Sequence, residues 1–258
     1  MDIKVIKIGG NVVDSPEALS AFVKDFSALE GNKILVHGGG VLASTLQKAL
    51  GQTPKMLEGR RITDADTLRV VTMVYAGWCN KSVVALLQAE GCDAMGLSGA
   101  DGNVLKAVRR PAEPVDYGFV GDVSPERVNC ALLRSLLSSG TVPVLCAITH
   151  DGNGSLLNTN ADTVASCVAS ALAGEDSVDL IYCFEKAGVL ADKDDDSSLI
   201  PLITPSTYAA LKASGTVSDG MIPKLDNAFK AISSGVKSVI VKHAGNLLGD
   251  VQTTLRAY

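Results

Sequence analysis

A lysine and two glycines stand at the end of the first apolar run of the sequence. Lys7 lies inside the run Ile3–Ile8, and Gly9 and Gly10 follow that run directly. A cation inside a buried strand is costly unless an anion lies nearby. Paired glycines also let backbone N–H groups approach a phosphate closely. The pattern is typical of an anion site, and a structural turn with Lys7 reaching solvent explains it about equally well.

A second glycine-rich turn follows the apolar run Lys33–His37. Gly38, Gly39 and Gly40 lead straight into an expected helix, which would place a row of N–H donors at a helix N-terminus. The free N–H groups and the helix dipole favour anions there. The position predicts a second anion site and disfavours a merely flexible turn. His37 alone indicates only a packed or hydrogen-bonded side chain.

Two further clusters precede expected helices. Arg60 and Arg61 form a cationic pair, and arginine suits bidentate carboxylate binding, although one of two adjacent arginines is commonly a surface residue. Asn158, Asn160 and Asp162 gather amides with one carboxylate. A helix cap accounts for one of these three side chains but not for all of them.

A lysine also opens the last expected helix. The segment contains Asp219, Gly220, Met221 and then Lys224. A cation near a helix N-terminus opposes the helix dipole, so Lys224 is better explained by a nearby anion. Taken alone, an exposed surface lysine remains the simpler explanation of this cluster.

Common nucleotide and hydrolase motifs are missing from the sequence. It contains no GxxxxGK[ST] loop, no GxGxxG at a strand–helix junction, no GxSxG elbow, and no HRD or DFG motif. A Walker-type NTPase, a dinucleotide dehydrogenase, an α/β-hydrolase and a protein kinase are therefore disfavoured.

Composition excludes other classes. The chain has 258 residues, 47% apolar and 20% charged, with a net charge of −5. These proportions predict a sizeable core, and the acidic balance disfavours nucleic acid or an anionic membrane as partners. The apolar stretches are strand-length, so we expect no membrane span. Six scattered cysteines without a CxxC pair, and no signal-peptide pattern, favour free thiols in the cytoplasm.

Apolar β-branched runs alternate with amphipathic segments along the chain. This alternation predicts an α/β fold with a parallel sheet covered by helices on both faces. Strands are expected at Ile3–Ile8, Lys33–His37, Val142–Ala147, Val178–Phe184 and Ser238–Lys242. Helices are expected at Ser15–Leu29, Val41–Leu50, Asp64–Glu90 (with a break), Pro125–Ser139, Ala161–Ala173, Pro205–Ser214 and Met221–Ser234. The segments Gly102–Arg110 and Tyr117–Val123 are expected to form a hairpin.

Five motifs in this order resemble the amino-acid kinase family: IKIGG at 6–10, VHGGG at 36–40, GRRITD at 59–64, NTNAD at 158–162 and DGMIPK at 219–224. The resemblance implies a three-layer αβα sandwich with a mainly parallel central sheet, the fold of carbamate kinase. It also implies a lobe at residues 1–165 for the acyl amino acid and dimerisation, and a nucleotide lobe at residues 166–258.

Within the family, the order and spacing resemble those members that use ATP to phosphorylate the γ-carboxylate of N-acetyl-L-glutamate, the second step of arginine biosynthesis. That carboxylate is already ionised at neutral pH, so the reaction needs positioning and charge stabilisation more than a general base. Mg²⁺ is expected to arrive on the ATP phosphates, with no protein metal site.

The resemblance also implies roles for individual residues. Lys7 and Lys224 would neutralise the transferring phosphoryl group and the leaving ADP, and Asp162 would hold both lysines. Substrate contacts are implied for Gly39, Gly40, Arg61 and Asn158. Nucleotide contacts are implied for Gly9, Gly10, Glu185, Gly188, Asp219, Gly220 and Met221.

Two departures from the family pattern have consequences. Glu185 stands where the family usually has Asp before Gly-Val-Leu, and Lys186 adds a charge. The chain also starts at the first strand, without the N-terminal helix typical of arginine-inhibited hexamers. We therefore expect a homodimer that arginine does not inhibit.

Two alternatives stay open. An N-succinyl-L-glutamate kinase would need a further cation near the acyl group, for which Arg60, Arg109 and Arg110 are candidates. A catalytically silent, ligand-sensing homologue is the other, and the presence of Lys7, Asp162 and Lys224 together argues against it.

Overall fold

The computed structural model describes residues 1–57, 59–192, 194–217 and 221–258. Within these residues the main sheet has eight strands, in the order β12-β14-β13-β11-β1-β2-β8-β5. Neighbouring strands run parallel except for the antiparallel pair β13–β14. The strands are β1 (Asp2–Ile8), β2 (Asn32–His37), β5 (Ala94–Leu97), β8 (Val142–Cys146), β11 (Ser177–Phe184), β12 (Leu202–Ile203), β13 (Ser238–His243) and β14 (Gln252–Leu255).

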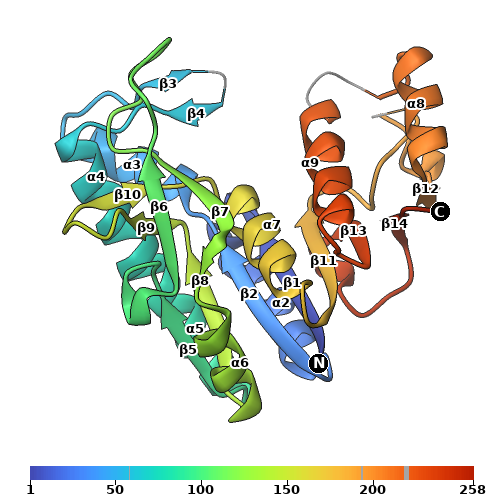
Figure 1. Ribbon diagram of the computed structural model, residues 1–258, viewed down its shortest axis with the longest axis horizontal. Coiled ribbons are helices and arrows are strands. Elements are labelled where there is room, and N and C mark those ends of the chain that lie inside the picture. The colour runs from blue at the N-terminus through green and yellow to red at the C-terminus, as the bar shows by residue number, and fades with distance from the viewer. Residues whose placement is uncertain (58, 193, 218–220) are drawn as a thin grey trace.

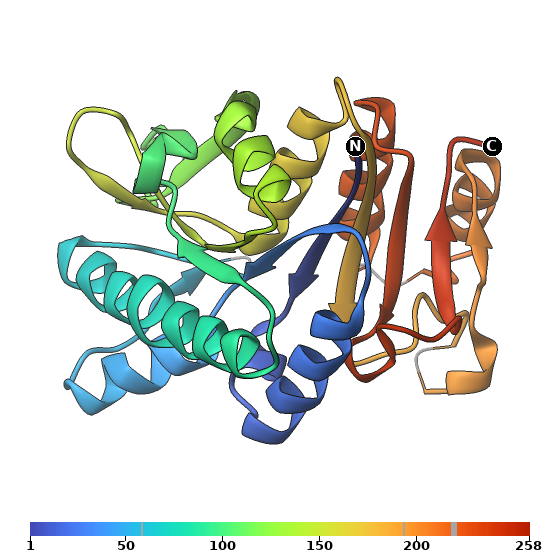
Figure 2. The same cartoon turned by 90° about the horizontal axis from the view of Figure 1, so that it is seen from below.

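Helices cover both faces of this sheet, which confirms the predicted three-layer α/β architecture. One face carries α2 and a long helix made of α4, η1 and α5, and the other carries α6, α7 and α9 (Figures 1 and 2). The helices are α1 (Gly10–Val13), α2 (Pro16–Ala28), α3 (Gly40–Ala49), α4 (Ala65–Thr72), η1 (Met73–Cys79), α5 (Asn80–Ala89), α6 (Cys130–Ser138), α7 (Ala161–Leu172), α8 (Pro205–Ala213) and α9 (Ile222–Ser233).

A smaller sheet, in the order β10-β9-β6-β7, and a short hairpin complete the first part of the chain. Their strands are β6 (Leu105–Arg109), β7 (Gly121–Val128), β9 (Ile148–His150), β10 (Leu156–Asn158), β3 (Met56–Leu57) and β4 (Arg60–Arg61). The strands β6 and β7 pair antiparallel, so the predicted hairpin is confirmed. Short helical turns lie at η2 (Asp101–Asn103), η3 (Asp196–Ser198) and η4 (Ala244–Asn246).

The expected helix Pro125–Ser139 is wrong over its first five positions. Residues 125–128 continue β7, where Val128 pairs with Leu105, and the helix starts only at Cys130. Asn129 sets that start, because its side chain accepts a hydrogen bond from the N–H of Leu132 at 3.1 Å. An Asn cap of this kind satisfies one free donor of the first turn.

The long helix Ala65–Ala89 is continuous, so the break expected within Asp64–Glu90 is replaced by a change of helix type. Its centre, Met73–Cys79, is π-helical, a local widening that is frequent at functional sites. With 25 residues and a mean hydropathy of 1.4, this helix is long and apolar enough to cross a membrane, contrary to the expectation of strand-length apolar runs only. It packs against β5, β8 and α2 inside the protein.

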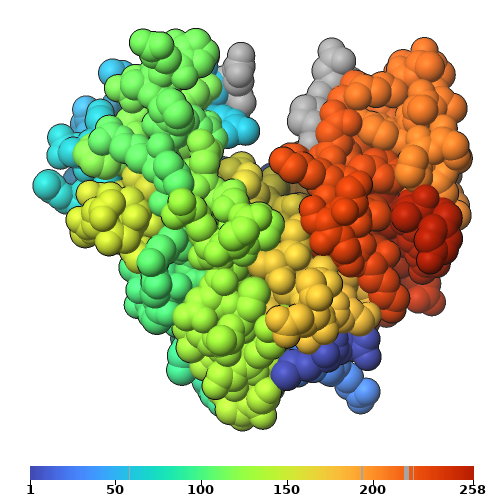
Figure 3. Space-filling model, in the orientation of Figure 1, coloured from blue at the N-terminus to red at the C-terminus, as the bar shows by residue number. Residues whose placement is uncertain are grey.

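The carboxyl ends of β1, β2 and β11 lie at one edge of the sheet, where a cleft opens. In Figure 3 the hollow lies between the part of the chain that carries β3, β4 and β7 and the part that carries α8 and α9. The expected boundary between the two lobes, between residues 165 and 166, lies inside α7, which contacts β1, β2 and β11.

Candidate active site

Lys7 lies at the carboxyl end of β1 with a carboxylate beside it. Its Nζ is 2.7 Å from Oδ1 of Asp162, and only 7% of the residue is exposed. Asp162 lies in the first turn of α7, which is capped by Asn160, whose side chain accepts a hydrogen bond from the N–H of Thr163. A carboxylate is favoured at a helix N-terminus. The pair therefore supplies the anion that a buried Lys7 was expected to need.

One aromatic ring lies beside both candidate catalytic lysines. Lys7 Nζ is 5.5 Å from the centroid of the Phe184 ring, and Lys224 Nζ is 4.3 Å from it. Phe184 ends β11, and Lys224 lies in the first turn of α9. The structure therefore brings the two lysines together, although they are 217 positions apart in the sequence. Among the described residues, Asp162 forms an ion pair with Lys7 and none with Lys224.

A cavity of about 320 Å³ lies between the first glycine turn and α9. The predicted nucleotide-binding residues Gly9, Gly10, Glu185, Gly188 and Met221 line it together with Lys224. Lys186, which the sequence marks as an additional charge, also lines it, as do Asn11 and Phe184, which were not predicted. Their positions directly after the first glycine pair and at the end of β11 were the available signal. Asp219 and Gly220 lie outside the described residues.

Glu185 and Asn11 close one wall of this cavity. The Nδ2 of Asn11 donates a hydrogen bond to Oε1 of Glu185, so the first glycine turn is tied to the end of β11. Lys186 forms an exposed ion pair with Asp196 at 3.1 Å. The unusual Glu185 thus contacts the glycine turn directly, and the additional charge of Lys186 is balanced on the surface.

Arg61 is held rigidly on the opposite side of the cleft. Its guanidinium donates to Oε1 of Gln47 at 2.5 Å, to the carbonyl of Gly40 at 2.9 Å and to Oγ of Ser44 at 2.8 Å. These three acceptors all belong to α3. Because the guanidinium is planar and carries five N–H donors, the remaining donors keep a fixed direction. Arg61 is 7% exposed and lines the cleft.

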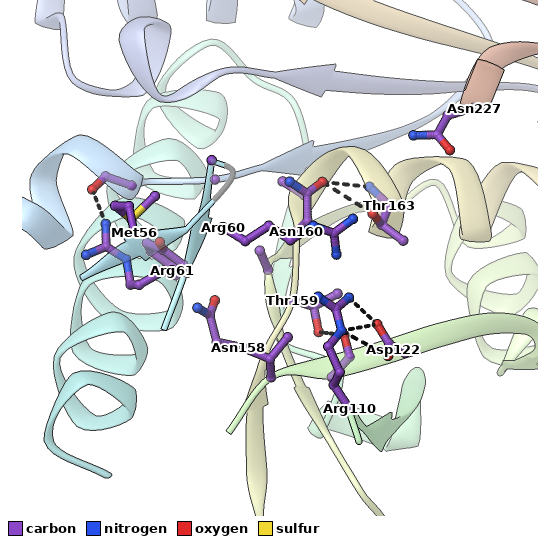
Figure 4. A pocket seen from close by; sticks show the side chains of 18 residues that line it. Met56, Arg60, Arg61, Arg110, Asp122, Asn158, Thr159, Asn160, Thr163 and Asn227 are labelled. Atoms are coloured by element: carbon purple, nitrogen blue, oxygen red, sulfur yellow. Dashed lines mark hydrogen bonds and ion pairs between the residues drawn. The ribbon is translucent and has the colours of Figure 1, made fainter. Parts of the chain in front are cut away.

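Asn158 and the second glycine turn lie around Arg61 in a cleft of about 370 Å³ (Figure 4). Asn158 donates from Nδ2 to Oγ1 of Thr63 at 3.0 Å, which leaves its amide oxygen without a partner among the described contacts. Gly40 lines the same cleft, and Gly39 caps α3 directly before it. The predicted carboxylate-binding set is therefore assembled in one place.

The two cavities meet at the glycine turns. A Cβ added to Gly10 would lie 3.8 Å from the backbone nitrogen of Gly40. The glycine turns after β1 and after β2 are therefore neighbours. An anion bound at each turn would face the other across a short gap, which suits transfer of a group from one anion to another.

His37 is buried and neutral. Its Nδ1 is 2.7 Å from the carbonyl of Gly38, and Nε2 is 3.0 Å from Nδ2 of Asn80. Because the amide of Asn80 is a donor, Nε2 accepts and Nδ1 donates. Burial is the main cause that lowers the pKa of His37 to about 4. His37 therefore fixes the glycine turn as a neutral imidazole, in agreement with its predicted role as a hydrogen-bonded core residue.

The three candidate cations for a longer acyl group are placed differently. Arg60 and Arg110 line the cleft, and Arg110 forms an ion pair with Asp122. Arg109 lies over the ring of Phe119 at 4.5 Å and donates to the carbonyl of Gly118. Arg60 and Arg110 thus lie at the cleft, whereas Arg109 contacts Phe119 and Gly118.

The described part of the chain contains no group of three His, Cys, Asp or Glu side chains placed to hold a metal ion. Its six cysteines are free thiols. What the cleft offers is two lysines, two rows of backbone N–H groups and one fixed guanidinium. This set neutralises and orients anions, and contains no imidazole ready to accept a proton.

Comparisons with known proteins agree with this geometry. The acetylglutamate kinase of Cytophaga hutchinsonii is 55% identical over 245 residues, covering 95% of this chain and 92% of that protein. The acetylglutamate kinase of Phocaeicola vulgatus is 54% identical, covering 93% and 92%. The solved structure of smu.665 from Streptococcus mutans UA159 has a TM-score of 0.80 at 28% identity, covering 99% of each chain. Residues 2–243 match the amino acid kinase family, and the chain belongs to that family.

Proposed function

We propose that this protein is an acetylglutamate kinase that transfers the γ-phosphoryl group of ATP to the γ-carboxylate of N-acetyl-L-glutamate, the second step of arginine biosynthesis. One observation carries the proposal: the cleft that contains the hydrogen-bonded Arg61 and the cavity lined by Lys224 adjoin where Gly10 and Gly40 are neighbours. Relatives at 50–55% identity with the name acetylglutamate kinase support the choice of substrate.

The proposed roles follow from the contacts. Arg61 and Asn158 hold the α-carboxylate and acyl amide, so that the γ-carboxylate points to the glycine turns. Lys7 offsets negative charge on the phosphoryl group as it is transferred, and Lys224 offsets negative charge on the leaving ADP. Asp162 fixes the Nζ of Lys7 through their 2.7 Å contact. Positioning and charge stabilisation of this kind account for most of the rate enhancement in phosphoryl transfer.

The nucleotide would bind in the cavity of about 320 Å³, with Gly9, Gly10, Glu185, Gly188 and Met221 as its proposed contacts. Mg²⁺ would arrive with ATP, its ligands being phosphate oxygens and water, as is usual for nucleotide-borne Mg²⁺. Use of ATP and a small metabolite supports a cytoplasmic location.

A homodimer is also part of the proposal. The long helix exposes Trp78 at 70% and Met73 at 48% of their surface, an apolar area of the kind that a second copy covers. Light scattering in solution tests this: a twofold mass is expected, and a monomer or hexamer would contradict it.

The decisive test measures ADP release with Mg-ATP and three acids: N-acetyl-L-glutamate, N-succinyl-L-glutamate and free L-glutamate. We expect the N-acetyl compound to be preferred, with Lys224→Ala, whose kcat should fall about 10²–10³-fold, as the control. Preference for the succinyl compound would assign Arg60 and Arg110 to a distal carboxylate and reject the acetyl substrate. No turnover with any acid would favour a silent homologue.

A further inference from the structure

Tyr75 lies at the bottom of the substrate cleft without a role in the reaction described above. It belongs to the π-helical segment η1, lines the cleft, and is 6% exposed. Its ring packs closely on the second glycine turn, because a Cβ added to Gly39 would lie 2.9 Å from Tyr75 Cδ1. The same Cβ would lie 2.9 Å from the Sγ of Cys79. Two residues of the π-helical segment therefore support Gly39.

The hydroxyl of Tyr75 lies between the second glycine turn and the fixed arginine. A Cβ added to Gly40 would lie 3.9 Å from this oxygen, and Arg61, which donates to the carbonyl of the same Gly40, acts to lower the pKa of Tyr75. An arginine side chain can only donate hydrogen bonds, so Arg61 does not take up the proton of the Tyr75 hydroxyl. Burial raises the pKa of Tyr75, which keeps the O–H protonated.

The proton of that hydroxyl has no acceptor among the hydrogen bonds of the described residues. Asp14 is a carboxylate near the Tyr75 hydroxyl. Its Oδ2 would lie 3.5 Å from a Cβ on Gly10, and neither of its oxygens has a hydrogen-bond partner in the described residues. A buried donor without an acceptor costs free energy, and here the donor faces a cleft. The donor is therefore available to an anion that enters beside Arg61.

We propose that Tyr75 is a further substrate-binding residue, whose hydroxyl donates a hydrogen bond to the α-carboxylate of the acyl-glutamate beside Arg61. The inference rests on the proposed function, since it assigns one more contact to the same substrate. Tyr75 and Cys79, four positions apart in the π-helical segment, both lie against Gly39. Asn80, directly after this segment, reaches His37.

The test compares Tyr75→Phe with Tyr258→Phe, a matched control at a residue that is 99% exposed. Hydrogen bonds to charged groups are among the stronger ones, so their loss is expected to raise KM for N-acetyl-L-glutamate about tenfold or more. KM for ATP and Tm should stay near the wild-type values. Equal increases in both KM values, or a lower Tm with an unchanged KM for the acid, would overturn the assignment.

A substrate analogue separates binding from a structural role. In N-acetyl-L-glutamate with an α-carboxamide, the acceptor has no charge, so the Tyr75→Phe penalty should shrink severalfold. An equal penalty for acid and amide would remove Tyr75 from the carboxylate site. Calorimetry on the wild-type protein with N-acetyl-L-glutamate separates failure of the proposed function from failure of this contact. If the wild type neither binds nor turns over the acid, the proposed function and the contact are both rejected. If the wild type binds and turns over the acid and Tyr75→Phe behaves in the same way, only the contact is rejected.

Discussion

The proposed acid side of the cleft, around Arg61, and the proposed nucleotide side, around Lys224, are built differently. On the acid side, Arg61 makes three hydrogen bonds to α3 and is 7% exposed. On the nucleotide side, Lys224 is exposed and rests on the Phe184 ring. The acid side thus has its geometry before any ligand arrives, whereas the phosphate side leaves cationic charge for the ligand to complete. Recognition of a small acid depends on fixed direction, and handling of a polyphosphate depends on charge.

The largest effect is expected on the phosphate side. Lys7→Ala and Lys224→Ala should each lower kcat about 10²–10³-fold, as for loss of one oriented donor to a transition state. Steady-state kinetics measures this, with Lys230→Ala, an exposed lysine on the same helix as Lys224, as the control. Turnover near the wild-type rate in either variant would remove that lysine from the mechanism.

On the acid side, His37 should make stability depend on pH. Its pKa of about 4 in the folded protein lies below the ordinary 6.5, so the unfolded chain takes up the proton first as pH falls. Its contribution to the free energy of unfolding is complete above pH 6.5, and up to about 3 kcal/mol is lost by pH 4.

Urea unfolding at pH 7 and pH 4.5 tests this for the wild type, His37→Gln and the exposed control His243→Gln. The pH-dependent loss should be smaller only in His37→Gln. The same loss in all three proteins would show that other groups control acid stability.

The fixed guanidinium should be more sensitive to geometry than to charge. Arg61→Lys keeps the cation but loses the planar fork, so KM for N-acetyl-L-glutamate should rise roughly 10- to 30-fold and KM for ATP little. Arg69→Lys, whose side chain is 75% exposed, is the matched control. A parallel rise in both KM values would mean that the acid side is not independent of the nucleotide side.

A further expected effect, on stability and not on catalysis, concerns the support of the second glycine turn. In Gly39→Ala the new methyl group would lie 2.9 Å from Cys79 Sγ and from the Tyr75 ring, whereas in Gly77→Ala it would meet nothing within 4 Å. We expect Gly39→Ala to cost about 1–3 kcal/mol of unfolding free energy and Gly77→Ala to be neutral or slightly stabilising. Similar losses of unfolding free energy in the two variants would show that the second glycine turn accommodates the added methyl group at little cost.

Much of the architecture could be predicted because it depends on local patterns. Five of the eight strands of the main sheet follow from buried β-branched runs. Two predicted helices begin where expected, because the side chains of Ser15 and Asp64, their first predicted residues, cap them. Lys7 could be singled out because a cation in a buried strand requires an anion. The segment 125–128 shows the limit: whether it is helix or strand depends on pairing with β6, which its own sequence does not specify.

Partners that come from distant parts of the chain could not be predicted in the same way. The hydrogen bonds of Arg61 to Gln47 and Ser44, the placement of Phe184 beside two lysines, and the contact of Tyr75 with Gly39 all join separate elements. Periodicity reports which face of a segment is buried, not which side chain it meets there. The residue types therefore specified charged groups, glycine turns and the order of strands and helices, whereas packing of those elements chose the neighbours that give each group its direction and protonation state.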